Sequence, residues 1–274
     1  MRGFRREKKL STWRRLALHA WSAPDSPTIY GTLEIDATEA TSYVRTLRRE
    51  GGPRVTITHL VGHAVAAAIR TRPEVNAIIR FGSVYRRETI DVYYQVAFEG
   101  GEDLNGFKIP RADEKDVLTI ARELEEGARA VRARKTEAVA SARRFGKMPA
   151  FLTGVAMRAG TFAHYDLGLD MSRFGVPYDG FGSVMVTNVG GFGLATGLAP
   201  LVPFSRCPII LLVGEIRERP VVRGGAIVAR PILPIGVSVD HRLVDGYQAS
   251  KVAAKFVEIM EHPRTMLPER LAAE

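Results

Sequence analysis

The sequence predicts an α+β sandwich in which a mixed or largely antiparallel sheet is covered by helices. Helical patterns dominate the first half of the chain, and antiparallel-looking strand patterns gather in its last third. A doubly wound parallel sheet would instead alternate strand and helix throughout. The 274 residues, of which 46% are hydrophobic, suffice for one domain with a real core. Because we find no internal repeat or low-complexity linker, we expect a basic arm over residues 1–10 and a single domain over residues 11–274.

Four helices and three strands are predicted in the first half of the chain. Apolar residues at 10, 13, 16, 17 and 20 predict a helix that Pro24 ends, and residues 28–35 predict a strand. Asp36 is placed to cap the next helix, and Thr58 to cap a helix that Pro73 ends. Strands are predicted over 78–85 and 91–98, and a long amphipathic helix over 116–135.

The last third of the chain is more regular. Strands are predicted over 183–188, 208–216 and 232–240, and a helix over 247–260. Residues 220–230 read as a hairpin, because Gly224-Gly225 suits a two-residue turn. Residues 145–182 are rich in glycine, proline and aromatic residues and give no assignable element.

Composition narrows the class of protein. No run of eighteen apolar residues exists, so neither a transmembrane helix nor a membrane partner is expected. No apolar stretch follows the basic N-terminus, which argues against a secretory signal. The single cysteine, Cys207, is expected to be a buried structural thiol, which fits a cytoplasmic location. The net charge of +9 attracts polyanions such as nucleic acid, acidic proteins or a phosphate-rich cofactor like coenzyme A. A solvated helix face and a flexible basic arm explain the same charge more simply, and nucleic-acid binding would rest on charge alone.

His241 is the foremost catalytic candidate, because it lies between a strand pattern and the Asp245-Gly246 pair that opens a helix. A neutral imidazole there can take a proton from a thiol or alcohol and return it to the leaving group, typically worth about 10²–10⁴ in rate. Spacing alone still favours a polar loop residue. For Asp245, spacing alone favours a helix N-cap, worth about 1 kcal/mol, or a structural salt bridge over a direct catalytic role.

Thr187 is the second candidate, because it ends a strand that runs into a glycine-rich turn. Its hydroxyl could stabilise a tetrahedral oxyanion. Taken alone, however, threonine is simply a good strand former. Three other patterns carry no function. Gly191–Gly197 has the wrong spacing for a dinucleotide-binding loop, and Ser183 lacks the flanking residues of a nucleophile elbow. The His59/His63 pair lacks the glutamate of a zinc-protease motif, so no metal is expected.

Six segments in order carry a resemblance to a known family. They are LSTWRRLALHAW, PTIYGTLEIDATEATSY, VTITHLVGHAVAAAIRTRPEVNAII, DVYYQVAFEGGEDLNGFKIPRADEKDVLTIARE, FGSVMVTNVGGFG and VGEIRERPVVRGGAIVARPILPIGVSVDHRLVDG. Together they resemble the catalytic domain of the dihydrolipoyl acyltransferases of 2-oxo acid dehydrogenase complexes, which are relatives of chloramphenicol acetyltransferase. The last segment holds the signature DHRxxDG.

The resemblance implies a chloramphenicol-acetyltransferase-like fold and a homotrimer with active sites between subunits. It implies that His241 deprotonates the thiol of coenzyme A or dihydrolipoamide, and that Thr187 steadies the oxyanion. Asp245 would hold the loop through an arginine, for which Arg14 and Arg15 are candidates. Coenzyme A or acyl-CoA would be a substrate, and neither a metal nor a covalent enzyme intermediate would be needed.

Several departures from the family pattern leave alternatives open. No lipoyl or subunit-binding domain is expected, so a lipoyl group would act in trans on another protein, with dehydrogenase subunits as further partners. The family's "GL" reads Asp103-Leu104, the segment 147–178 is longer, and the polar C-terminus leaves cage assembly undecided. A catalytically vestigial scaffold is therefore the competing hypothesis.

Overall fold

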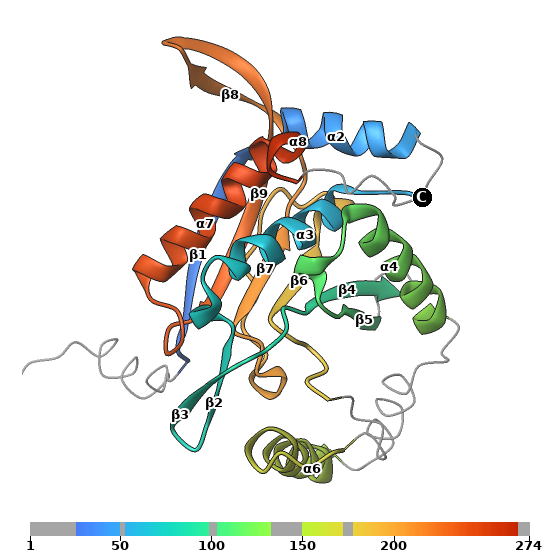
Figure 1. Ribbon diagram of the computed structural model, residues 1–274, viewed down its shortest axis with the longest axis vertical. Coiled ribbons are helices and arrows are strands. Elements are labelled where there is room, and N and C mark those ends of the chain that lie inside the picture. The colour runs from blue at the N-terminus through green and yellow to red at the C-terminus, as the bar shows by residue number, and fades with distance from the viewer. Residues whose placement is uncertain (1–25, 50–52, 99–102, 133–149, 172–177, 268–274) are drawn as a thin grey trace, which may run out of the picture.

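The structure, a computed structural model, describes residues 26–49, 53–98, 103–132, 150–171 and 178–267 (Figure 1). The strands are β1 Thr28–Asp36, β2 Ala77–Arg80, β3 Ser83–Arg86, β4 Val92–Phe98, β5 Asp103–Ile109, β6 Val184–Asn188, β7 Ile209–Val213, β8 Arg217–Arg223 and β9 Ala226–Asp240. The α-helices are α2 Thr38–Arg49, α3 Ile57–Arg70, α4 Val117–Arg132, α6 Ala150–Thr161, α7 Gly246–Glu261 and α8 Pro263–Met266. The short helical turns are η1 Pro73–Val75, η3 Ala112–Glu114, η4 Phe162–Asp166, η6 Gly190–Phe192 and η7 Pro203–Ser205.

The described strands form one mixed sheet and a separate hairpin. The seven-stranded sheet has the order β1-β9-β7-β6-β4-β5, with β8 added alongside β9. β6 is parallel to both β4 and β7, and the other pairs in this sheet are antiparallel. Helices α2, α3, α4 and α7 share the main hydrophobic core with one face of this sheet (Figure 1). The predicted α+β sandwich with a mixed sheet is therefore confirmed.

Alternation along the strands assigns side chains to the two faces of the sheet. On β6, Val184 and Val186 belong to the core under the helices, whereas Met185 packs with Cys207 and Ile210 in a second cluster. The loop over residues 194–201 crosses this second face. A Cβ atom on Gly236 would overlap the carbonyl oxygen of Gly197, so only glycine allows the loop to approach β9 this closely.

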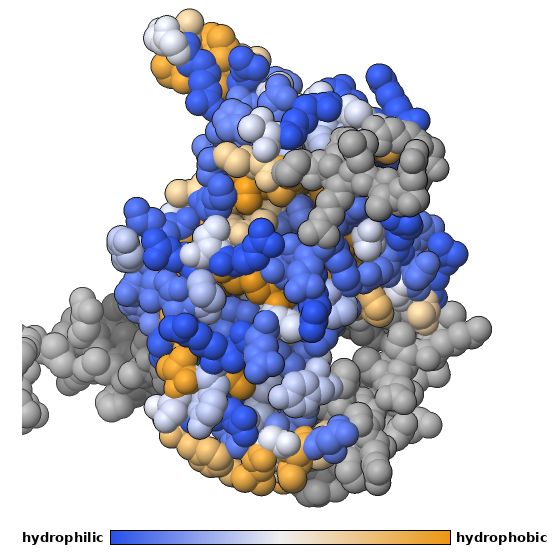
Figure 2. All heavy atoms as spheres, viewed as in Figure 1, coloured by the Kyte–Doolittle hydropathy of each residue, from blue (hydrophilic) through white to orange (hydrophobic). Residues whose placement is uncertain are grey.

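Strands β8 and β9 extend beyond the sheet as a two-stranded arm (Figure 1). The predicted turn at Gly224-Gly225 is confirmed, with both residues at positive φ. Val222 and Ile227 face each other across the arm and are 70% and 77% exposed. Figure 2 shows hydrophobic surface gathered at this arm and again at the opposite end of the molecule.

Three details of the secondary structure differ from the expectation. Residues 78–85 form two strands, because Phe81 and Gly82 both adopt positive φ and make a tight turn. Residues 103–109 form strand β5, a stretch to which the sequence pattern assigned no element. Thr56, and not Thr58, is the N-cap of α3. The helix expected over residues 10–21 lies outside the described residues.

His59 on α3 links folding to pH. Burial lowers its pKa to about 4, with a smaller contribution from nearby Arg48. Its Nδ1 accepts the backbone N–H of Thr56 at 3.0 Å, so the native fold uses the neutral ring. The unfolded chain takes up this proton near pH 6.5, as histidine ordinarily does. The stability that the neutral ring provides is therefore lost as the pH falls from about 6.5 to about 4.

We expect His59→Gln, which keeps an acceptor for Thr56, to remove part of this acid destabilisation. The contribution is on the order of 3 kcal/mol between the two pH limits. His63 remains in the variant, and burial also lowers its pKa, so some pH dependence should persist. Urea unfolding of both proteins across this pH range measures the effect. Equal losses of unfolding free energy in wild type and variant would contradict the assignment.

Candidate active site

His241 lies at the junction of β9 and the loop that leads into α7. Its backbone N–H donates to the carbonyl oxygen of Pro27 at 2.9 Å, and the N–H of Asp240 donates to that of Pro208 at 2.9 Å. These bonds fix the junction between the segments that lead into β1 and β7. The side chain of His241 remains exposed, so a substrate can reach it.

The hydrogen bonding of His241 selects one tautomer of its ring. Nδ1 lies 3.2 Å from the carbonyl oxygen of Val244. A carbonyl oxygen only accepts hydrogen bonds, so Nδ1 must carry the proton in this contact. Nε2 is then the nitrogen with the free lone pair, which is the form that a general base requires.

Asp240 and Arg242 hold the loop around this histidine. The guanidinium of Arg242 donates to both carboxylate oxygens of Asp240, at 2.9 and 2.6 Å. The backbone N–H of Arg242 also donates to Asp240, at 3.0 Å. This pair was not among the residues that the sequence predicted for the site. It gives the first and third residues of the DHR motif a positioning role.

Asp245 caps helix α7. Its Oδ1 accepts the backbone N–H of Gln248 at 3.0 Å, and Gln248 Oε1 accepts the N–H of Asp245 at 2.9 Å. This reciprocal capping box fixes where the helix begins. It corresponds to the capping alternative from the sequence. Arg14 and Arg15, the expected partners, lie outside the described residues.

Thr187 lies at the carboxyl end of β6 and is half-buried. Alternation puts it on the same face as Met185, away from the helices. The next residue, Asn188, faces the helices, where its Nδ2 donates to Thr58 Oγ1 at 2.7 Å. Its Oδ1 accepts the backbone N–H of Gly191 at 3.2 Å. Asn188 thereby fixes the strand end that carries Thr187, a role that the sequence did not predict.

The fold does not bring His241 and Thr187 together within one chain. Thr187 is in register with Leu212 on β7, which is in register with Gly236 on β9. His241 follows Gly236 by five residues, or roughly 16 Å along the strand direction. Two strand spacings add roughly 10 Å across the sheet, so the two backbones are roughly 19 Å apart. One reacting carbonyl cannot contact both residues of the same chain.

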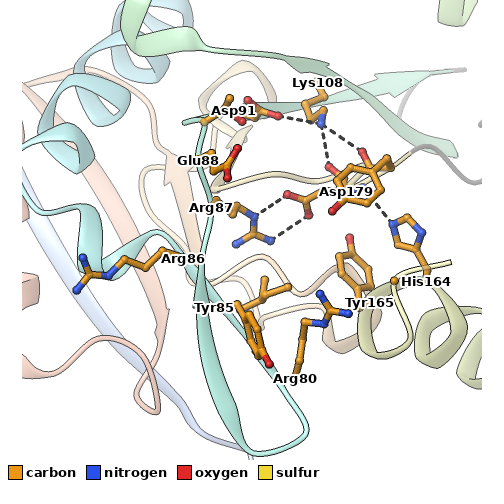
Figure 3. A pocket seen from close by; sticks show the side chains of 14 residues that line it. Arg80, Tyr85, Arg86, Arg87, Glu88, Asp91, Lys108, His164, Tyr165 and Asp179 are labelled. Carbon is orange, nitrogen blue, oxygen red and sulfur yellow. Dashed lines mark hydrogen bonds and ion pairs between the residues drawn. The ribbon is translucent and has the colours of Figure 1, made fainter. Parts of the chain in front are cut away.

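A pocket of about 460 Å³ opens between the β2–β3 hairpin, β4–β5 and the segment that precedes β6 (Figure 3). Its walls are formed by Ile78, Arg80, Tyr85, Arg86, Arg87, Glu88, Thr89, Asp91, Lys108, His164, Tyr165, Gly168, Tyr178 and Asp179. None of the three predicted site residues lines it. It is therefore a feature distinct from the His241 junction.

Ion pairs neutralise most of the charge in this pocket. Arg87 donates to both carboxylate oxygens of Asp179 at 2.6 and 3.0 Å, and Lys108 lies 2.8 Å from Asp91 (Figure 3). Burial opposes the charged form of Asp91, but hydrogen bonds from Lys108 and the backbone N–H of Arg111 outweigh it and lower the pKa. Because these cations are already paired, the network mainly fastens the segment that carries Asp179 to the hairpin.

We expect Asp179→Asn to destabilise the protein by about 2 kcal/mol, because the buried guanidinium of Arg87 would lose its charged partner. Asparagine is the suitable replacement, since Asp179 has a φ of 42° and asparagine tolerates that conformation. Glu88→Gln is the matched control, because Glu88 lines the same pocket but is exposed. The control should stay within about 0.5 kcal/mol of wild type in denaturant unfolding. Equal effects of the two changes would count against the network.

The family model described as "2-oxoacid dehydrogenases acyltransferase (catalytic domain)" matches residues 6–141 and 179–268. A Bacillus subtilis protein, the lipoamide acyltransferase component of branched-chain alpha-keto acid dehydrogenase complex, is 24% identical over 245 residues, which is 88% of this chain and 48% of the relative. A Rickettsia felis protein, the dihydrolipoyllysine-residue acetyltransferase component of pyruvate dehydrogenase complex, is 23% identical over 214 residues. This is 78% of this chain and 42% of the relative. The chain thus spans less than half the length of these curated relatives.

Solved structures share the fold. A probable dihydrolipoamide acetyltransferase from Listeria monocytogenes has a TM-score of 0.66 at 22% identity, with 98% of this chain and 99% of that chain covered. The dihydrolipoamide acetyltransferase of Azotobacter vinelandii has a TM-score of 0.66 at 19% identity, with 89% of this chain and 85% of that chain covered. That structure is described as an investigation of the role of a serine, a histidine and an asparagine in the catalytic mechanism.

Proposed function

The chain belongs to the family of 2-oxoacid dehydrogenase acyltransferase catalytic domains, and we propose on this basis that it moves an acyl group between coenzyme A and a thiol carrier. His241 is the general base in this proposal. The main support is the contact of its Nδ1 with the Val244 carbonyl, which leaves Nε2 free to accept a proton. The rigid loop around it, held by Asp240 and Arg242, supports the same role.

The reaction needs one base and one donor to the oxyanion. Nε2 of His241 takes the proton of the incoming thiol, and the thiolate attacks the carbonyl carbon of the thioester. A new C–S bond forms, and the carbonyl oxygen becomes an oxyanion to which the hydroxyl of Thr187 donates. The tetrahedral intermediate collapses, the original C–S bond breaks, and the proton on Nε2 passes to the departing thiolate. The acyl group has changed thiols, and the histidine is neutral again.

A second copy of the chain supplies the Thr187 of each site in this proposal. The register separates His241 and Thr187 of one chain by roughly 19 Å, so one chain cannot place both at one carbonyl. A homotrimer, as in the resemblance, would join the two ends of neighbouring sheets. The β8–β9 arm supports assembly, because an isolated two-stranded hairpin with exposed Val222 and Ile227 is marginal in water.

The carrier thiol is proposed to be dihydrolipoamide on another protein. The relatives are named as dihydrolipoyllysine-residue or lipoamide acyltransferase components of dehydrogenase complexes. Dehydrogenase subunits are proposed as further partners on the same ground. The acyl group is left open between acetyl, succinyl and branched-chain groups, because the relatives' names include acetyl, succinyl and branched-chain components.

The direct test is acyl transfer by the purified protein from acetyl-, succinyl- and branched-chain acyl-CoA to dihydrolipoamide. We expect acyl-dihydrolipoamide and free coenzyme A to form in equal amounts, which chromatography of both products measures. A folded oligomer that transfers none of these groups would refute the proposal. In that case, calorimetric titration with coenzyme A tests the competing hypothesis of a scaffold. A scaffold without catalysis is expected to show no binding of coenzyme A.

A further inference from the structure

Residues 205–208 connect η7 to β7, and we call them the 205–208 link. At the end of the link, the carbonyl oxygen of Pro208 accepts the backbone N–H of Asp240 at 2.9 Å. Asp240 directly precedes His241, and its carboxylate holds Arg242. A displacement of the link would therefore move the backbone that carries the proposed catalytic base.

The backbone of the link adopts an unfavourable conformation at Arg206. Its φ is 51°, in the left-handed region that residues other than glycine seldom adopt. A residue remains there only where its surroundings fix it, and such positions gather at functional sites. Arg206 is two residues from Pro208, so their Cα atoms are at most about 7 Å apart. The contacts that hold Arg206 therefore help to set the position of Pro208.

The side chain of Arg206 joins two other parts of the chain to the link. Its Nη2 donates to Asp166 Oδ2 at 2.8 Å, in an ion pair whose two side chains are 27% and 10% exposed. Its Nη1 donates to the carbonyl oxygen of Ile79 on β2 at 3.2 Å. Because the ion pair is largely shielded from water, removing either partner would leave the charge of the other uncompensated. Arg206 thus ties the link to both η4 and β2.

Two further hydrogen bonds hold the backbone of the link. Nη2 of Arg87, which lines the pocket, donates to the carbonyl oxygen of Arg206 at 3.1 Å. The hydroxyl of Tyr165 donates to the carbonyl oxygen of Ser205 at 3.1 Å. Tyr165 and Asp166 are neighbours in η4, so this short element contacts two successive residues of the link.

Element η4 belongs to residues 142–178, which the family model does not match. The same region contains α6, which, like the other helices in the described residues, lacks the length and apolar character needed to cross a membrane. The contacts of η4 with the link connect this unmatched region to β7, the strand that begins directly after Pro208. A region outside the family's pattern therefore reaches the junction that carries His241.

We propose that Arg206 is a positioning residue for His241, and that it couples the unmatched region to the catalytic base. The bonds of Arg206 to η4 and β2 hold the link, and Pro208 carries its position through Asp240 to the backbone of His241. The imidazole is thereby aimed at the incoming thiol, and a misplacement of about 1 Å can lower the rate about 10²-fold. This inference rests on the proposed acyl transfer and deepens it.

The first test is kinetic and uses the full-length protein, dihydrolipoamide and the most active of the three acyl-CoA substrates. Arg206→Asn removes the guanidinium and keeps a residue that tolerates a positive φ. We expect its turnover to fall about 10–100-fold, while the Kd for coenzyme A stays close to that of wild type. Arg206→Lys keeps the charge and should recover most of the rate. Asp166→Asn should also slow turnover, and the double variant should be no slower than Arg206→Asn, because the two residues act as one unit.

Glu123→Gln is the matched control for the loss of an ion pair. Glu123 Oε2 lies 2.7 Å from Lys115 Nζ, and the two side chains are 33% and 20% exposed. Glu123 lies on α4, which packs against α3, β4 and β5, so this variant should turn over like wild type. Circular dichroism and urea unfolding establish that each variant is folded in the assay. Turnover of Arg206→Asn within twofold of wild type would overturn the proposal, as would additive losses in the double variant or an equal loss in Glu123→Gln.

The second test does not depend on activity. Isotope-labelled histidine gives an NMR signal for each ring, and the signal of His241 is identified by its absence in His241→Gln. We expect Arg206→Asn and Asp166→Asn to shift this signal and Glu123→Gln to leave it in place. If wild type transferred no acyl group and the signal still shifted, the proposed function would fail and the coupling of Arg206 to His241 would stand. An unmoved signal in Arg206→Asn would refute the coupling, whatever the activity of wild type.

Discussion

Replacing His241 by alanine is expected to slow acyl transfer by about 10²–10⁴, because the incoming thiol would lose its proton acceptor. The effect should fall on the turnover rate, while the affinity for coenzyme A stays close to that of wild type. Steady-state transfer to dihydrolipoamide and calorimetric titration with coenzyme A measure the two quantities. An unchanged turnover rate would disprove the base assignment.

This variant should remain folded, which makes the kinetic result interpretable. The ring of His241 is exposed, and the hydrogen bond that the structure gives it joins Nδ1 to the Val244 carbonyl. The bonds that fix the loop come from the backbone and from Asp240 and Arg242, which the substitution leaves in place. His241→Gln is a useful second variant, since it keeps a polar side chain without a general base.

Replacing Thr187 by alanine is expected to lower turnover by about 10²–10³, the usual cost of losing one donor to an oxyanion. Thr187→Ser keeps the hydroxyl and should retain most of the activity. Thr187→Val keeps the shape of the side chain and should resemble alanine. If the valine variant were as active as wild type, Thr187 would be a strand residue and no more.

The two variants together test the sharing of the site between copies. In a mixed trimer, a chain with Thr187→Ala still offers His241, and a neighbouring chain with His241→Ala still offers Thr187. With equal amounts of the two chains, about one quarter of the interfaces in a closed ring would join two intact residues. Co-expression should therefore restore about that share of wild-type turnover. No recovery in a mixed oligomer would mean that each site uses residues of one chain.

The sequence was sufficient for the parts of the fold where pattern and turn chemistry agree. Gly224-Gly225 marked its hairpin, and the run up to Asp240 marked the strand that ends just before His241. The β2–β3 turn was missed because it places a phenylalanine, Phe81, at a φ of 47°, and no short-range rule favours that. Strand β5 was missed because it is defined by pairing with β4, which the local sequence pattern did not reveal.

Features that depend on contacts between distant residues could not be predicted from the sequence. The ion pair of Arg87 and Asp179 joins positions 92 residues apart, and periodicity has no bearing on such a pair. The separation of His241 from Thr187 follows from the strand order, which the sequence did not specify. His241 and Asp245 could be proposed from the sequence because they belong to one short segment, DHRLVDG.

The placement of His241 and Thr187 at opposite ends of one sheet has a consequence for how the enzyme responds to its own concentration. A lone subunit would carry His241 at one place and Thr187 at another, and so would have no complete catalytic centre. Specific activity should then fall steeply on dilution, once subunits begin to dissociate, and should return when the solution is concentrated. Assembly itself would thereby act as the activating step, without any added effector.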